Sequence, residues 1–276
     1  MPRIATLCLL TALAASPAAA TEPFTFTLVS PEADFTAREV TAILYRAEVG
    51  GTPDFTGRDL TYLDLSALDF KGAKLTRADL YGTDFTNANL KGADLEAARL
   101  DRAVLIKTDL SGANLAGASI YRPTVYSDLN ALLTDAPRFR GANMARVKVQ
   151  ADLSGADFAG ADLTDADFHP LEDRPGEGTL VTLRRNVVKS CDFSGVRAER
   201  ANFSEAVLTF SRMTGASLKG ANFRDADLSM VDFSGADLSG ADLTGADLDG
   251  AKLAGARGLD TVIGLDKTVN LDKAFR

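Results

Sequence analysis

Residues 73–100 read AKLTR ADLYG TDFTN ANLKG ADLEA ARL, with a leucine or phenylalanine at every fifth position. The same spacing runs from Phe55 to Ile120 through fourteen successive large apolar residues, and it returns over residues 153–168 and 203–253. A period of five matches neither the 3.6 residues of an α-helix nor the two-residue alternation of a β-strand. The chain must therefore bend once in every five residues.

The residues around each large apolar side chain also repeat. Two positions earlier the residue is small, one position earlier it is usually Asp or Asn, and two positions later glycine is common. If the large and the small residue both point inward, they alternate across one short extended segment. Glycine then lies where the chain turns. Four such sides close a square coil of about 20 residues, and coils stack about 4.8 Å apart.

This pattern resembles the pentapeptide-repeat family over most of residues 54–257. The resemblance implies an all-β fold, a right-handed quadrilateral parallel β-helix in which each coil contacts only its neighbours. Residues on one side of such a coil differ by 20, which predicts inward columns. The residues expected in the structural core are Leu80, Leu100, Leu110, Phe203, Phe223, Leu228 and Phe233.

Residues 1–20 have the features of a secretory signal peptide. Arg3 supplies a positive charge, and residues 4–15 form an apolar stretch that is too short to span a bilayer. Small residues then define a cleavage site, after which the mature chain would be periplasmic or secreted. The residues that define this site are Ala18, Ala20 and Thr21.

Two other interpretations of this segment remain open, a buried N-terminal helix and, through Cys8, a lipoprotein. After signal removal Cys191 is the only cysteine, so no intramolecular disulfide can form despite an oxidising destination. Loss of Arg3 changes the formal net charge from −8 to −9. The mature chain is therefore mildly acidic.

Both ends of the repeat need covers, because a solenoid exposes open β edges. Within the N-terminal segment 21–53, Thr36 and Glu39 form a capping box that predicts a helix over 37–47, lying on the first coil. Residues 258–276 are expected to form a C-terminal cap. The family resemblance implies that this end could also form a homodimer, and an intrachain cap is the alternative. The apolar residues of this cap are Val262, Ile263, Leu265, Val269, Leu271 and Phe275.

Residues 121–141 interrupt the period and include a predicted short helix at 127–133. Leu153 follows Ile120 by 33 positions, which is not a multiple of five, so the register changes across this stretch. The segment is therefore expected to leave the coil as a loop.

Residues 169–187 form a second interruption. Val188 follows Phe168 by 20 positions, the length of one coil, which predicts a degenerate coil with a bulged loop. Segments that depart from a rigid scaffold often hold binding residues, although insertions without a function would have the same pattern. The candidate recognition residues are Tyr126, Arg138, His169, Arg174, Arg184 and Arg185.

The sequence offers no catalytic constellation. His169 is the single histidine, and its spacing from Cys191 gives no reason to expect that they meet. Cys191 holds an inward position normally taken by alanine, where a thiol acts as a small inert hydrophobe. The many aspartates stand at outward positions, where they can bond nearby backbone. We therefore predict no enzyme, no cofactor and no metal.

Acidic residues are dense between 227 and 247, but they lie on different sides of the coil and form a belt. Stacked by 20, the columns alternate in sign, as in Arg212, Asp232 and Lys252. In this run only Asp227 over Asp247 stacks like charges. The family resemblance implies gyrase protection by DNA mimicry, which would need a continuous negative potential.

These features predict an exported, non-enzymatic scaffold that binds an unknown protein or envelope component and no nucleic acid. Two alternatives stay open. The first is a DNA-mimicking, gyrase-protecting protein, and the second is a structural spacer with no specific ligand.

Overall fold

The computed structural model describes residues 33–47, 51–128, 134–170 and 185–275. Glu32–Arg276 forms one compact unit. Within the described ranges, no helix is both long and apolar enough to cross a bilayer. The predictions that fall outside these ranges concern the signal peptide 1–20 with Ala18, Ala20 and Thr21, residues 129–133 of the short helix, and Arg174 and Arg184.

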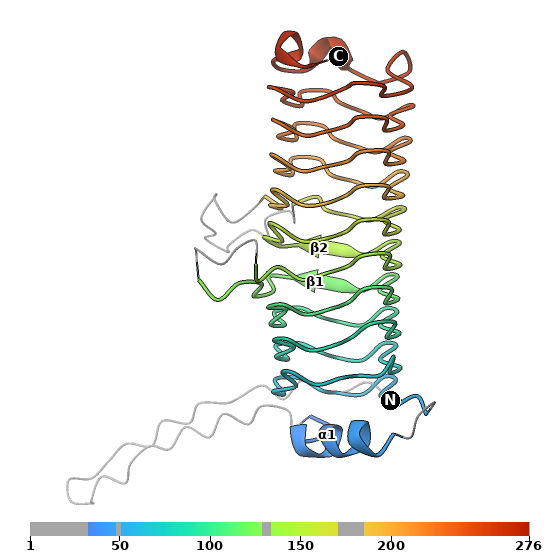
Figure 1. Ribbon diagram of the computed structural model, residues 1–276, viewed down its shortest axis with the longest axis vertical. Coiled ribbons are helices and arrows are strands. Elements are labelled where there is room, and N and C mark those ends of the chain that lie inside the picture. The colour runs from blue at the N-terminus through green and yellow to red at the C-terminus, as the bar shows by residue number, and fades with distance from the viewer. Residues whose placement is uncertain (1–32, 48–50, 129–133, 171–184, 276) are drawn as a thin grey trace, which may run out of the picture. The chain divides into compact units, whose positions relative to one another are not determined.

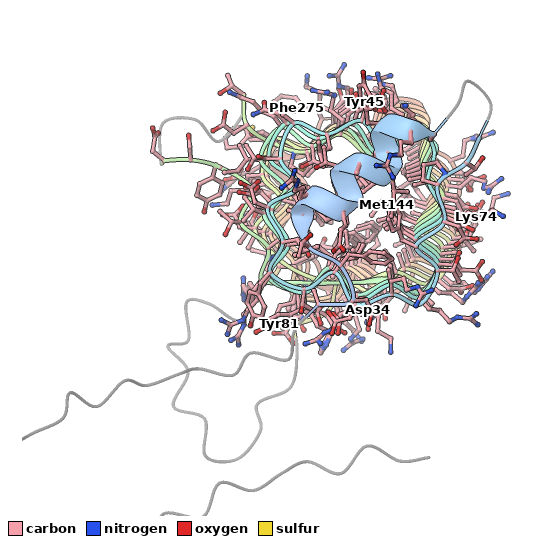
Figure 2. All side chains as sticks on the ribbon, turned by 90° about the horizontal axis from the view of Figure 1, so that it is seen from below. Asp34, Tyr45, Lys74, Tyr81, Met144 and Phe275 are labelled. Carbon is pink, nitrogen blue, oxygen red and sulfur yellow. The ribbon has the colours of Figure 1, made fainter. Side chains whose placement is uncertain are left out.

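The repeat forms a stack of four-sided coils (Figure 1). Parallel bridges join residues 20 apart along four columns. The columns of the first coil start with the pairs Asp54–Lys74, Asp59–Asp79, Asp64–Asp84 and Asp69–Asn89. We call these columns sides 1 to 4, and the two-residue turn after each side the corner of the same number. Figure 2 looks along the stack, with Lys74 on side 1, Tyr81 at corner 2 and Phe275 on side 4. The predicted quadrilateral β-helix is confirmed.

Regular strands are short because each side is only five residues long. β1 (Ser119–Tyr121) and β2 (Lys148–Gln150) pair in parallel on side 2 of successive coils. Elsewhere each side contributes a single bridge, flanked by backbone hydrogen bonds such as that from Leu80 N–H to Arg99 O at 2.9 Å. The backbone polar groups of one coil are thus satisfied by its neighbours.

The interior is filled by the large apolar residue and the alanine two positions before it. All seven predicted core residues, including Leu100 and Leu228, are completely buried. Phenylalanines on the same side stack, with ring centroids 4.7 Å apart for Phe158–Phe193 and 5.3 Å apart for Phe203–Phe223. A small residue, most often alanine, stands two positions earlier because a long side chain there would collide with this column.

Outward aspartates close many corners. Asp79 Oδ1 accepts the N–H of Tyr81 at 3.1 Å, and Asp237 Oδ1 accepts that of Ser239 at 3.1 Å. The bonds from Ser239 lower the pKa of Asp237, because they favour the charged carboxylate. An aspartate that stands before a large apolar residue and closes its corner is therefore structural, as the sequence predicted.

α1 (Ala37–Arg46) lies across the open end of the first coil (Figure 2). Its predicted capping box is present, and the helix ends one residue before the predicted boundary. Lys71 Nζ donates to the carbonyl of Leu44 at 2.8 Å and so ties the helix C-terminus to corner 4. Phe35 packs edge-on against Phe55, with ring centroids 5.9 Å apart. The helix covers apolar surface that the first coil would otherwise expose.

The C-terminal cap is built from widened corners. The 3₁₀ turns η2 (Leu265–Lys267) and η3 (Leu271–Lys273) lie at corners 2 and 3 and lengthen the last coil. Val262, Leu265 and Leu271 pack against the core, whereas the other three predicted cap residues point outward and are exposed. The exposed residues are Ile263, Val269 and Phe275. The expectation that all six close the coil is therefore correct for half of them.

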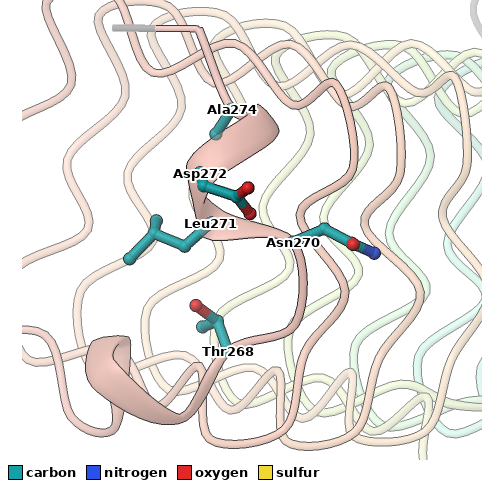
Figure 3. Close-up of a pocket in the computed structure, with 5 residues that line it drawn as sticks. All are labelled: Thr268, Asn270, Leu271, Asp272 and Ala274. Carbon is teal, nitrogen blue, oxygen red and sulfur yellow. The ribbon is translucent and has the colours of Figure 1, made fainter.

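A shallow, open depression lies at the C-terminal end of the stack (Figure 3). Its lining is Thr268, Asn270, Leu271, Asp272 and Ala274. With only five residues, one of them apolar and large, it offers little enclosed surface to a ligand.

The first interruption is an insertion at corner 3. Thr124 begins side 3, whereas Arg138, which pairs with Asp109, begins side 4 fourteen residues later instead of five. Nine additional residues therefore leave the coil here. In the next coil Lys148 on side 2 and Asp152 on side 3 are only four residues apart. The insertion and this deletion together produce the register change that the sequence predicted.

The second interruption is also an insertion, at corner 2. Asp167 begins side 2 and Val187 begins side 3, which pairs with Asp152 of the preceding coil. Twenty residues thus advance the chain by one side rather than by four. The prediction of a degenerate coil over 169–187 is wrong, because fifteen extra residues happen to be a multiple of the five-residue period.

Candidate functional site

The two interruptions open at opposite edges of side 3, within three consecutive coils. The first leaves the stack at corner 3, after Tyr126. The second leaves at corner 2, after His169, and side 3 resumes at Val187. The side-3 segment that begins at Asp152 lies between them. One face of the solenoid is therefore bordered by both irregular segments.

A buried carboxylate fastens the first interruption to the stack. Asp135 accepts hydrogen bonds from the hydroxyl and the N–H of Ser127, at 2.7 and 3.1 Å, and lies 3.1 Å from Lys107 Nζ. Lys107 N–H also donates to the carbonyl of Asp135 at 2.6 Å. The bonds from Ser127, helped by Lys107, lower the pKa of Asp135 to about 2. At neutral pH the charged carboxylate therefore holds both ends of this segment on corner 3.

A buried asparagine closes the second junction. Asn186 Oδ1 accepts the N–H of Ala151 at 2.7 Å, and its Nδ2 donates to the carbonyls of Val149 and Phe168 at 3.0 and 2.6 Å. These backbone groups lie where one coil is a residue short and the next carries the insertion, so the regular ladder cannot reach them. This residue was not among those predicted from the sequence. Its signal is a fully polar side chain two positions before Val188, where a small residue is usual.

Two of the predicted recognition residues border side 3. Tyr126 is half-buried at corner 3, where burial and the carboxylate of Asp152 in the next coil raise its pKa. Arg185 is exposed and lies two residues before Val187, at the corner 2 edge. Because Val187 pairs with Asp152, these two side chains flank the same stretch of side 3 from opposite edges.

Two others belong to the coils themselves. Arg138 Nη2 lies 2.9 Å from Asp109 Oδ2 on side 4. Burial would raise the pKa of Asp109, but hydrogen bonds from Ser111 and Arg138 outweigh it and hold that pKa well below its ordinary value. His169 Nε2 is 3.9 Å from Glu205 Oε1, one coil further along corner 2. The four candidate residues that lie in the described ranges therefore do not converge on a single point.

Cys191 is in the core, as predicted. Its Sγ donates to the carbonyl of Leu153 at 3.2 Å, and burial raises the pKa of the thiol well above its ordinary value. A thiol that stays protonated and inaccessible is a poor nucleophile. Among the residues that the structure describes, no group of three or more His, Cys, Asp or Glu side chains could hold a metal ion.

Side 3 differs from the other sides in charge. On sides 2 and 4, for example, ion pairs between Arg99 and Asp79 and between Arg212 and Asp192 connect successive coils. No lysine or arginine stands in the outward column of side 3, and no ion pair within the described ranges reaches that column. Its members are Asp64, Asp84, Val104, Thr124, Asp152, Val187, Val207, Asp227, Asp247 and Val269.

The predicted alternation of charge in the later coils is confirmed. Asp232 stacks between Arg212 and Lys252, whereas Asp227 stacks on Asp247. Like-charged pairs also occur outside that run. They are Asp59–Asp79, Asp64–Asp84 and Asp157–Asp192. Two of the four like-charged stacks therefore lie on side 3, where no cation offsets them.

A sequence model of pentapeptide repeats matches the chain in eight copies, over residues 54–87, 83–121, 149–169, 191–229 and 226–257. These ranges hold more than half of the chain and are separated at the two interruptions. The chain belongs to the pentapeptide-repeat family. No curated protein sequence matches it.

Several solved structures resemble this pentapeptide-repeat protein. HetL from the cyanobacterium Nostoc sp. strain PCC 7120, involved in heterocyst differentiation regulation, is 26% identical over 84% of this chain and 92% of that chain, with a TM-score of 0.41. QnrB1, a plasmid-mediated fluoroquinolone resistance protein, is 20% identical over 74% and 88% of the two chains, with a TM-score of 0.28. A thylakoid lumen protein of Arabidopsis thaliana is 28% identical over 44% and 70%, with a TM-score of 0.26.

The corners of this pentapeptide-repeat protein share one backbone conformation but not one residue type. The second residue of the turn has a positive φ, the left-handed region that favours glycine. At corner 4 every described turn has glycine there, at Gly72, Gly92, Gly112, Gly141, Gly160, Gly195, Gly215, Gly235 and Gly255. At corner 3 only Gly155 and Gly250 follow this rule. The other corner 3 residues are Ala67, Asn87, Lys107, Ser190, Phe210 and Met230.

Proposed function

We propose that this protein is an exported, non-enzymatic scaffold that binds a protein or envelope component through side 3 and the interruptions beside it. The observation that carries the proposal is that both interruptions open onto side 3 within three consecutive coils. A rigid stack positions irregular segments accurately, and binding residues often lie on such segments. The anchors at Asp135 and Asn186 hold the described ends of both segments in place.

Export is supported by the signal-peptide features of residues 1–20. Expression of the full chain in a Gram-negative host, followed by fractionation and intact mass measurement, tests it. We expect the periplasmic product to begin at Thr21. An unprocessed chain confined to the cytoplasm would contradict export and leave the proposed binding face unaffected.

DNA mimicry receives less support from the charges. Ion pairs between neighbouring coils interleave positive and negative groups on sides 1, 2 and 4, for example Lys252 with Asp232 and Arg197 with Asp162. A duplex mimic should instead present a continuous negative potential. We therefore expect the mature protein to leave gyrase supercoiling unchanged, and inhibition at stoichiometric concentrations would reverse this preference.

The binding proposal can be tested by removing each interruption while keeping the coil intact. Deletion of 127–135 joins Tyr126 to Ala136 and restores a five-residue side between Thr124 and Arg138. Deletion of 171–185 retains Asn186 and restores the period at corner 2. Pro170→Gly accompanies the second deletion, because proline cannot adopt the positive φ that the restored turn needs.

Wild type and both deletion variants are immobilised and exposed to an envelope extract of the native host. We expect a defined partner on the wild type and its loss from at least one deletion variant. Circular dichroism and thermal unfolding confirm that each variant keeps the stack. Equal capture by all three proteins would remove the interruptions from the binding site, and no capture by any of them would favour a structural spacer.

A further inference from the structure

Two large apolar side chains occupy corner 3 in successive coils. Phe210 and Met230 are 66% and 50% exposed, and both have a positive φ, of 62° and 60°. A side chain in the left-handed region costs roughly 1–2 kcal/mol, and exposure of apolar surface adds no stability to the fold. The two residues are 20 positions apart and so are adjacent along the stack. Features that burden the fold are candidates for function.

The residue at corner 3 of the next coil allows the apolar surface of the pair to extend along the stack. Gly250 follows Met230 by one coil, and a Cβ built on it would lie 2.6 Å from Met230 Sδ. Met230 therefore extends over the glycine and continues the apolar surface toward the end of the stack. Val207, half-exposed on side 3 of the Phe210 coil, adds to the same surface.

Two carboxylates border this surface on side 3. Asp227 and Asp247 stand three residues before Met230 and Gly250, and they stack on each other. Within the described ranges, the hydrogen bonds that these carboxylates accept from Ser229, Asp249 and Asn270 all reach Oδ1, and no cation pairs with either carboxylate. Like charges on neighbouring strands repel unless a partner supplies the opposite charge.

We propose that these features form one docking surface for a polypeptide segment that presents an apolar side chain next to arginine. The apolar side chain would pack on Phe210 and Met230, and a guanidinium, with donors on both edges of its plane, would bridge Asp227 and Asp247. This assignment rests on the proposed function and names the chemistry of its partner. We refer to Phe210, Met230, Asp227 and Asp247 together as the apolar–acidic patch.

The charges select this occupant over others. A second copy that docked on this surface by two-fold symmetry would bring its own Asp227 and Asp247 against the same carboxylates. Anionic lipid and nucleic acid would be repelled for the same reason. A cationic, apolar segment satisfies both parts of the patch at once.

The test uses a fluorescent amphipathic peptide of leucine and arginine, titrated with the mature protein and followed by anisotropy. We expect saturable binding that weakens at least about tenfold in F210S/M230S and also in D227N/D247N. The matched control is D64N/D84N, which removes a like-charged pair from the same side in coils whose corner residues are Ala67 and Asn87. This control should bind as the wild type does.

Equal weakening in D227N/D247N and D64N/D84N would reduce the interaction to general charge attraction and overturn the assignment. Unchanged binding in F210S/M230S would do the same. The four substituted residues lie at the surface, so loss of folding is not expected, and thermal unfolding verifies this. If the captured envelope partner binds F210S/M230S as it binds the wild type, the patch fails while the broader binding function stands.

Discussion

Corner 4 places glycine at every described left-handed turn, from Gly72 to Gly255, whereas corner 3 places Phe210 and Met230 at the same backbone position. Both corners follow the same kind of side, turn with the same sign of φ and close on a completely buried column of large apolar residues. The residue at corner 4 is therefore the one that the backbone itself favours. At corner 3 most turns have a residue other than glycine at this position. The first interruption also leaves the coil at that corner.

The difference between the two corners shows how far selection for stability extends. Inside the coil the two corners are equivalent, since Leu228 before corner 3 and Phe233 before corner 4 are both completely buried. On the outer surface of the coil, the residue types at the two corners differ. A comparison of equivalent positions within one chain thus separates residues that the fold requires from residues that the fold merely tolerates.

The largest expected effect comes from breaking what the corners share. Leu228→Asp and Phe233→Asp should each destabilise the protein by about 3–5 kcal/mol, because an unpaired carboxylate would be buried between two coils. Chemical denaturation followed by circular dichroism measures this. Leu228→Met, which conserves volume, is the control and should cost less than about 1.5 kcal/mol. A small effect for either aspartate variant would mean that the coil can open locally without loss of the stack.

The junction beside side 3 is the next test. Asn186→Ala removes three hydrogen bonds and leaves the N–H of Ala151 and two carbonyls buried without partners, at a cost of about 3 kcal/mol. Asn222→Ala, on the outward column of side 2, removes bonds at the surface and should cost about 1 kcal/mol. Equal costs for the two would show that the irregular junction is no more dependent on its side chain than a regular side is.

Replacing glycine at corner 4 and introducing glycine at corner 3 tests whether glycine is the more stable residue at both corners. Gly235→Ala should destabilise by about 1 kcal/mol through backbone strain alone, because its Cβ would meet no atom within 4 Å. Met230→Gly should stabilise by about the same amount. Denaturation midpoints of purified variants measure both changes. If Met230→Gly instead destabilises, then Met230 contributes to the stack and its exposure needs no partner to explain it.

A further expected effect depends on pH. The pKa of Asp135 is lowered to about 2, so its bonds to Ser127 and Lys107 contribute stability above the ordinary carboxyl pKa and lose it as the pH falls through about 2. The difference in denaturation midpoint between wild type and Asp135→Asn should therefore be constant near neutral pH and shrink from about pH 4 to pH 2. A difference that is independent of pH over this range would show that the charge of Asp135 is not what fastens the segment.

Most of the fold could be predicted because it repeats. One five-residue rule, applied fourteen times without a break, determines the period, the inward columns and the role of the outward aspartates. The capping box at Thr36 is equally legible, since it depends on two residues three positions apart. Local rules of this kind need no knowledge of distant contacts.

The interruptions could not be predicted in the same way. Counting positions between Phe168 and Val188 suggested a full coil, whereas the pairing of Asp152 with Val187 shows a single side plus an excursion. Spacing alone does not distinguish the two when the excursion is a multiple of the period. Asn186 was missed for a related reason, because its three partners come from two successive coils and only the folded stack brings them together.

The apolar–acidic patch was also beyond the sequence analysis. Its parts are unremarkable along the chain, where Asp227 and Met230 look like one ordinary repeat with an unusual last residue. They form one surface only when the coils stack, because stacking places Phe210 on one side of Met230 and Gly250 on the other. The signal that could have indicated it is a large apolar residue, Phe210 and then Met230, at the second turn position of two successive coils on the same side.

The two insertions have a further consequence, which follows from where they enter the coil. Nine residues leave at corner 3 and fifteen at corner 2, yet the bridges on every side resume beyond them. The hydrogen bonds between coils do not depend on the length of an insertion. They depend only on the return of the chain to the next side. These corners are therefore natural grafting points. A foreign peptide placed there would be displayed at a fixed height on a rigid support, and its length could change without altering the spacing between any two other positions on the rod.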